Sequence, residues 1–104
     1  MSRPELLEDD RIDDWLGLHG EWRIEDAHLV REVVTTDYPS AIRIVDAQVE
    51  ICERLDHHPM ITIGYRTLQF ELWTHDRDGV TQLDLQYAEG LDTILNERKG
   101  DLAT

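Results

Sequence analysis

The stretch DYPSAIRIVDAQVEICERLDHHPMITIGYRTLQFELWTH, residues 37–75, decides the fold. Asp37 is a suitable N-cap and Pro39 falls in the first turn that follows it. Apolar residues then recur every three or four positions, which is the spacing of one helix face. This half of the stretch therefore predicts one long helix that ends near Leu55.

In the second half of the stretch, the spacing of the apolar residues changes from that of a helix to that of a strand. Pro59 cannot continue a helix and biases His58 toward an extended conformation. The adjacent His57 and His58 are thus predicted on the turn that leaves the helix. Beyond them, residues 61–65 and 68–74 are rich in β-favouring side chains, and the second run alternates apolar with polar positions. We expect a hairpin of two strands.

The flanking segments repeat this organisation. Residues 4–16 have helical spacing, and residues 21–24 and 29–34 resemble a second hairpin. Thr81 and Asp84 have the spacing of a capping box at the start of a last helix. The predicted order is α-β-β-α-β-β-α, an α+β fold with a four-stranded antiparallel sheet and three helices packed on one face.

Composition narrows the class of protein. The 104 residues, 40% of them hydrophobic, suit a single domain spanning residues 1–104. With 10 basic and 23 acidic residues, the net charge of −13 disfavours direct binding to nucleic acid or to an anionic membrane surface. A single cysteine, Cys52, and the lack of an apolar run long enough to span a membrane favour a cytoplasmic location.

Three histidines are the candidate functional residues. His57 and His58 precede Pro59, and His75 follows the last predicted strand. Imidazole has an ordinary pKa of about 6.5, so histidines that converge can exchange protons near neutral pH or bind a metal. The alternative, that the pair is only an exposed turn at a helix end, stays open on spacing alone.

The motifs around these histidines resemble the signature of the pterin-4a-carbinolamine dehydratases, over about residues 18–97. His-His-Pro is a weak motif by itself, whereas the ordered set is specific. The matching residues are Glu53-Arg54-Leu55-Asp56-His57-His58-Pro59, Tyr65, Thr74-His75-Asp76, Gly79, Thr81 and Asp84.

The resemblance implies dehydration of 4a-hydroxytetrahydropterin to quinonoid dihydropterin by histidine acid–base catalysis, with no cofactor and no metal. His57 and His75 are then the expected proton-transfer pair, with His58 as a third catalytic residue that positions the substrate. The implied wall of the substrate pocket also includes Asp56, Trp73, Thr74 and Asp76.

Several side chains have two interpretations. Glu53 and Asp84 could orient the imidazoles, or they could only solvate and cap a helix. Trp73 could stack on the pterin ring, although packing is the more common role of a strand aromatic. His19 and His28 match no motif and are expected at the surface.

Two other functions remain as alternatives. The three histidines with Asp56 or Asp76 could ligate zinc or iron. The resemblance also implies that the fold can act as a non-catalytic protein-binding module, either a transcriptional coactivator or an assembly chaperone. A homodimer or homotetramer is expected, because an open four-stranded sheet leaves edges that can pair.

Overall fold

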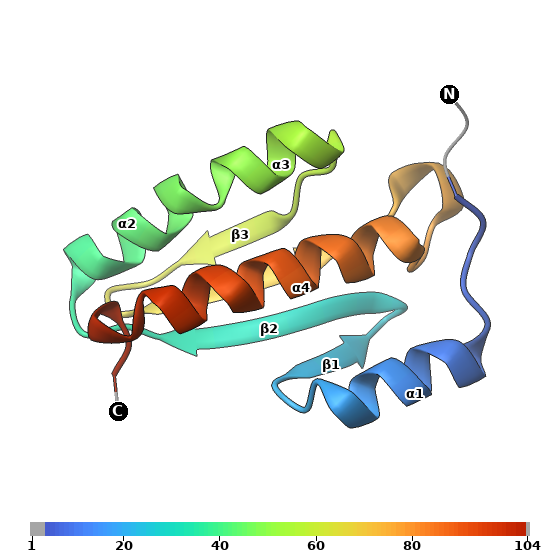
Figure 1. The fold of residues 1–104 in the computed structure, drawn as a ribbon, viewed down its shortest axis with the longest axis horizontal. Helices are drawn as coiled ribbons and strands as arrows, with labels where there is room; N and C mark the ends of the chain where they lie inside the picture. The colour runs from blue at the N-terminus through green and yellow to red at the C-terminus, as the bar shows by residue number, and fades with distance from the viewer. Residues whose placement is uncertain (1–3, 104) are drawn as a thin grey trace.

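The computed structural model describes residues 4–103 (Figure 1). Its centre is one antiparallel sheet in the order β1-β2-β4-β3. The strands are β1 (Trp22–Glu25), β2 (His28–Val34), β3 (Met60–Ile63) and β4 (Thr67–Leu72). The two hairpins lie side by side because β2 pairs with β4. The α+β class and the order of elements expected from the sequence are confirmed.

The helices cover one face of the sheet, with α4 running along its centre (Figure 1). Alternate residues of β4, namely Leu68, Phe70 and Leu72, are buried beneath the helices, whereas Gln69 and Glu71 between them are only half-buried. This is the period of two expected from the sequence. The helical elements are α1 (Asp9–Leu18), α2 (Tyr38–Ala47), α3 (Val49–Leu55), η1 (His75–Arg77), α4 (Gln82–Glu97) and η2 (Lys99–Asp101).

The expected single helix between residues 37 and 55 is instead two helices, α2 and α3, separated at Gln48. The side chain of Gln48 is buried, and its Oε1 accepts hydrogen bonds from Tyr87 Oη at 2.6 Å and Cys52 Sγ at 2.9 Å. Its Nε2 donates to the backbone oxygen of Val45. We attribute the break to this polar anchor in the core, which needs a residue from α4.

The first helix begins at Asp9, not at Pro4 as expected. The preceding residues pair with the segment that leads into α4: Leu6 forms a bridge with Thr81, and the Leu7 N–H donates to the Val80 oxygen at 3.0 Å. Extended pairing replaces the first helical turn, because these backbone groups gain partners from a distant segment. Among residues 4–103, no helix combines the length and apolar character needed to cross a bilayer.

The loop of the first hairpin is a two-residue turn between Glu25 and His28. Asp26 and Ala27 both have positive φ, at 51° and 65°. Two such residues are the mark of a type I′ turn, whose twist matches that of the flanking strands. The turn places His28 at the very start of β2, beside the end of β4.

Candidate active site

A cavity of about 230 Å³ lies where the end of α3 meets the segment after β4. Its wall contains all three histidines expected at the site. The lining residues are Asp56, His57, His58, Thr74, His75 and Asp76. Two segments that are distant in the sequence therefore meet at one cavity.

Backbone geometry sets each segment at the cavity. Asp56 ends α3 in the left-handed conformation (φ 49°, ψ 50°), and the His57 N–H donates to the Cys52 oxygen at 3.0 Å. Aspartate is among the few residues that adopt this conformation readily. The turn at Asp56 thus ends the helix before Pro59 is reached. On the other side, the Thr74 N–H donates to the Gly79 oxygen at 2.8 Å and closes the loop that carries His75.

His57 is held by a buried carboxylate. Its ring is only 6% exposed, and Nε2 lies 2.6 Å from Oδ1 of Asp84, which is fully buried. The other oxygen of Asp84 accepts bonds from the Thr81 N–H at 2.8 Å and the Thr74 hydroxyl at 2.9 Å. A carboxylate only accepts, so Nε2 of His57 carries a proton and Nδ1 is the nitrogen left for chemistry.

Asp84 therefore fills both roles that the sequence left open. It completes the capping box of α4 with Thr81, and it orients His57. The Thr81 hydroxyl also lies 2.7 Å from the Thr74 hydroxyl. Since Thr74 donates to Asp84, Thr81 is the donor to Thr74. The start of α4 and the wall of the cavity thus share one hydrogen-bond network.

His58 and His75 are more accessible. His58 Nε2 lies 2.8 Å from Glu53 Oε2, and both side chains are more than half exposed. Glu53 does contact an imidazole, but a pair in solvent contributes little to stability. His75 is exposed on η1 and faces the same cavity. The site combines one buried, anchored imidazole with two that reach solvent.

Trp73 is absent from the lining of this cavity among the residues described. One face of its ring stacks on His28 at 4.0 Å between centroids, with 7° between planes, and the other on His75 at 4.5 Å and 20°. Both faces of the indole are covered, so the geometry supports packing for Trp73 and not stacking on a substrate ring.

His19 and His28, expected at the surface, are partly exposed there, and each ring also stacks on a tryptophan. His19 stacks on Trp15 at 4.0 Å between centroids, and His28 stacks on Trp73. Both histidines are half-buried. The position of His28 follows from the pairing of β2 with β4. Leu29 pairs with Leu72 in an antiparallel register, so the preceding residue of β2, His28, lies beside the residue that follows β4, Trp73. That register could not be read from motifs alone.

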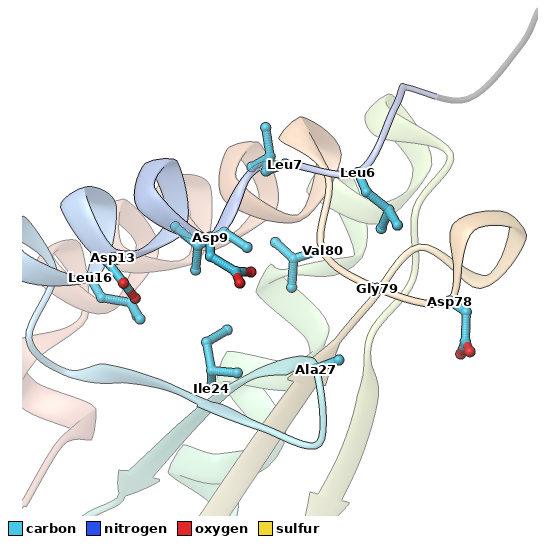
Figure 2. A pocket seen from close by; sticks show the side chains of 11 residues that line it. Leu6, Leu7, Asp9, Asp13, Leu16, Ile24, Ala27, Asp78, Gly79 and Val80 are labelled. Atoms are coloured by element: carbon cyan, nitrogen blue, oxygen red, sulfur yellow. The ribbon is translucent and has the colours of Figure 1, made fainter.

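A larger hollow of about 380 Å³ lies between α1, the turn of the first hairpin and the segment that enters α4 (Figure 2). Its wall is mainly aliphatic, and its titratable side chains are the carboxylates of Asp9, Asp13 and Asp78. Among the described residues, no imidazole lines this hollow, whereas three line the cavity at the end of α3. The histidine-lined cavity is therefore the candidate active site.

A metal site would require ligand side chains that converge on one point. Within residues 4–103, no three or more His, Cys, Asp or Glu side chains are grouped so that they could hold an ion. His57 directs Nε2 at Asp84, and His58 directs Nε2 at Glu53. These orientations are those of imidazoles held by carboxylates, which suits proton transfer.

The fold and cavity together define a small α+β protein with a histidine-lined site. The family model described as "Pterin 4 alpha carbinolamine dehydratase" matches residues 5–94. The chain belongs to this family, as the motif resemblance indicated.

Similar proteins agree with this assignment. A Mycobacterium sp. (strain KMS) protein named "Putative pterin-4-alpha-carbinolamine dehydratase" is 40% identical over 91 residues, covering 88% of this chain and 97% of its own. A Metallosphaera sedula protein of the same name is 40% identical over 73 residues, covering 70% and 76%.

Two solved structures share the fold. A "transcriptional coactivator/pterin dehydratase" from Brucella melitensis has a TM-score of 0.82 and 26% identity, over 86% of this chain and 98% of its own. A "pterin dehydratase-like protein" described as a RuBisCO assembly factor in the alpha-carboxysome has a TM-score of 0.58 and 16% identity, over 70% and 84%. The second likeness concerns the fold alone.

Proposed function

We propose that this protein dehydrates 4a-hydroxytetrahydropterin to quinonoid dihydropterin and water by histidine acid–base catalysis. Family membership supports the substrate class. The observation that carries the chemistry is His57, which is buried at the cavity and anchored through Nε2 by Asp84. A neutral imidazole held in this tautomer presents the lone pair of Nδ1 as a base.

The proposed reaction breaks the C4a–O bond and forms a C4a=N5 double bond. Nδ1 of His57 takes the proton from N5, and protonated His75 gives its proton to the departing hydroxyl, which leaves as water. After each turnover His75 has lost a proton and His57 has gained one. His75 is exposed, so it can take a proton from solvent, and His57 must release the proton that it took from N5. His58, Asp56, Thr74 and Asp76 would bind the polar edge of the pterin. No metal or bound cofactor is needed, because the two imidazoles supply both proton transfers.

The test is turnover of 4a-hydroxytetrahydropterin generated by an aromatic amino-acid hydroxylase. General acid–base groups contribute about 100- to 10,000-fold each, so His57→Ala and His75→Ala should each lose most of the rate. His58→Ala should raise KM more than it lowers kcat. Profiles of each variant from about pH 5 to about pH 9 would show which histidine acts as acid and which as base. A wild-type rate equal to that of the His57→Ala, His75→Ala double variant would reject catalysis.

A non-catalytic binding module is the second candidate function. It is favoured by the Brucella melitensis relative, which is described as a transcriptional coactivator as well as a pterin dehydratase. The anchored His57 weighs against it, because binding alone does not need a buried imidazole with a fixed tautomer. The double variant separates the two candidates: a binding module would keep its function with both histidines removed.

We also propose that the protein is a homodimer or homotetramer that works in the cytoplasm. The edge strands β1 and β3 each pair with one neighbour within the described chain. Residues on and just after β3 expose apolar side chains, with Met60 57% and Tyr65 80% exposed. An unpaired edge of this kind favours pairing with a second copy. Sedimentation of a species near 12.2 kDa at micromolar protein would reject self-association.

A further inference from the structure

The indole of Trp73 is the middle ring of a stacked column formed by His28, Trp73 and His75. The centroid separations are 4.0 and 4.5 Å, and the interplanar angles are 7° and 20°. One of the two outer rings belongs to His75, which is one of the proposed proton-transfer residues. Within the described residues, the His75 ring stacks with one face on the indole of Trp73 and makes no hydrogen bond to another side chain.

His75 depends on this stack because its side chain has no other anchor among the described residues. It begins a three-residue helical turn, η1, and its side chain is exposed. By contrast, His57 at the opposite wall is buried and anchored by Asp84. A catalytic group must be held close to its productive position, since a displacement of about 1 Å can cost about 100-fold in rate. The stack on Trp73 is the contact that restrains the His75 ring.

The other end of the column is fixed by the sheet. His28 follows the type I′ turn, and its Nδ1 lies 2.5 Å from Oε2 of Glu71 on β4. Glu71 and Trp73 are two positions apart, so their side chains point to the same face of the sheet. The carboxylate therefore holds the His28 ring flat against the face of the indole that is opposite His75. Both His28 and Glu71 are less than a third exposed.

We propose that His28 is a positioning residue for the reaction, acting through Trp73 on His75. This inference rests on the proposed function. His28 does not line the cavity. By closing the far face of the indole, it prevents Trp73 from tilting away, and Trp73 in turn keeps the His75 ring at the cavity. The column adds the first hairpin to an active site otherwise built from α3, η1 and α4.

The experiment compares His28→Ala with His19→Ala in the full-length protein. His19 stacks on Trp15 at the same 4.0 Å, but it lies outside the cavity lining and makes no contact with His75, so it controls for loss of a histidine–tryptophan stack as such. Removal of His28 should lower kcat about tenfold and leave KM within about twofold, because His75 acts on chemistry more than on binding. His19→Ala should keep the wild-type kcat.

Two further variants guard against a folding effect. His28→Phe restores an aromatic face against Trp73 and should recover most of kcat, whereas Glu71→Gln removes the charge that holds His28 and should lower kcat by a smaller factor than His28→Ala. If His28→Ala and His28→Phe lose equal activity while both remain folded, the column is not the cause and the proposal fails.

A second readout does not depend on turnover. The His75 ring is stacked on the indole, so the NMR resonances of its ring protons should be displaced by the ring current of Trp73. In His28→Ala this displacement should shrink, and in His28→Phe it should return. An unmoved His75 resonance in His28→Ala would overturn the inference, and so would a moved resonance with unchanged kcat. If the wild type has no dehydratase activity the proposed function fails, and the resonance alone then decides whether His28 positions His75.

Discussion

Replacement of Asp84 by asparagine should uncouple His57 from its anchor and remove activity from a protein that still folds. The carboxylate accepts three bonds, from His57 Nε2, the Thr81 N–H and the Thr74 hydroxyl. An amide of the same shape has one accepting oxygen and a donating nitrogen. At least one of the three buried donors must then face the donating nitrogen of the new amide.

The magnitude follows from one buried donor. If the amide oxygen keeps the Thr81 N–H and the Thr74 hydroxyl, the capping box survives and only His57 Nε2 faces a donor, which costs about 1–3 kcal/mol. This is less than the total stability of about 5–15 kcal/mol for a typical domain, so Asp84→Asn should remain folded. Urea unfolding followed by tryptophan fluorescence measures the loss.

The effect on activity should be larger than the effect on stability. If the new amide donates to Nε2 of His57, the proton moves to Nδ1 and the base is lost. We expect kcat to fall about 100-fold or more. Asp37→Asn is the matched control, since Asp37 caps α2 through the Ser40 N–H at 2.8 Å and lies outside the cavity lining. A folded Asp84→Asn protein with kcat within about threefold of wild type would refute the role given to His57.

Three further outcomes are expected. Burial raises the pKa of the Cys52 thiol, so iodoacetamide near pH 8 should alkylate the folded protein at least about tenfold more slowly than the urea-unfolded chain; equal rates would show an accessible thiolate. Hydrogen bonds from Ser40 lower the pKa of Asp37, so the stability it contributes is present above the ordinary carboxyl range and is lost as pH falls through the folded pKa. The unfolding midpoints of wild type and Asp37→Ala should therefore differ near neutral pH and converge in strong acid; a constant difference would contradict this. Activity should be unchanged after dialysis against EDTA, and recovery of lost activity on adding zinc or iron would restore the metal alternative.

Much of the fold could be predicted because its signals are local. The alternation of Leu68, Phe70 and Leu72 and the capping box of Thr81 and Asp84 each depend on residues a few positions apart, and both are present in the structure. The break at Gln48 could not be predicted in this way. It depends on Tyr87, which is 39 residues further along the chain.

The candidate site was also predictable from the sequence only in part. The motifs around His57, His58 and His75 indicated the segments that form the cavity, and the structure brings these segments together. The same motifs could not decide whether Asp84 caps a helix or orients an imidazole, because both roles need only one carboxylate at one helix start. Its two oxygens do both.

The sequence by itself determined the order of the main helices and strands and the side-chain chemistry available, because periodicity, capping and residue type are properties of short segments. Only the tertiary structure decided which rings stack. The pairing of Leu29 with Leu72 aligns β2 with β4 and sets His28 against Trp73. Such a contact requires two strands to adopt one register, and register is chosen by the burial of the whole sheet and not by any one motif.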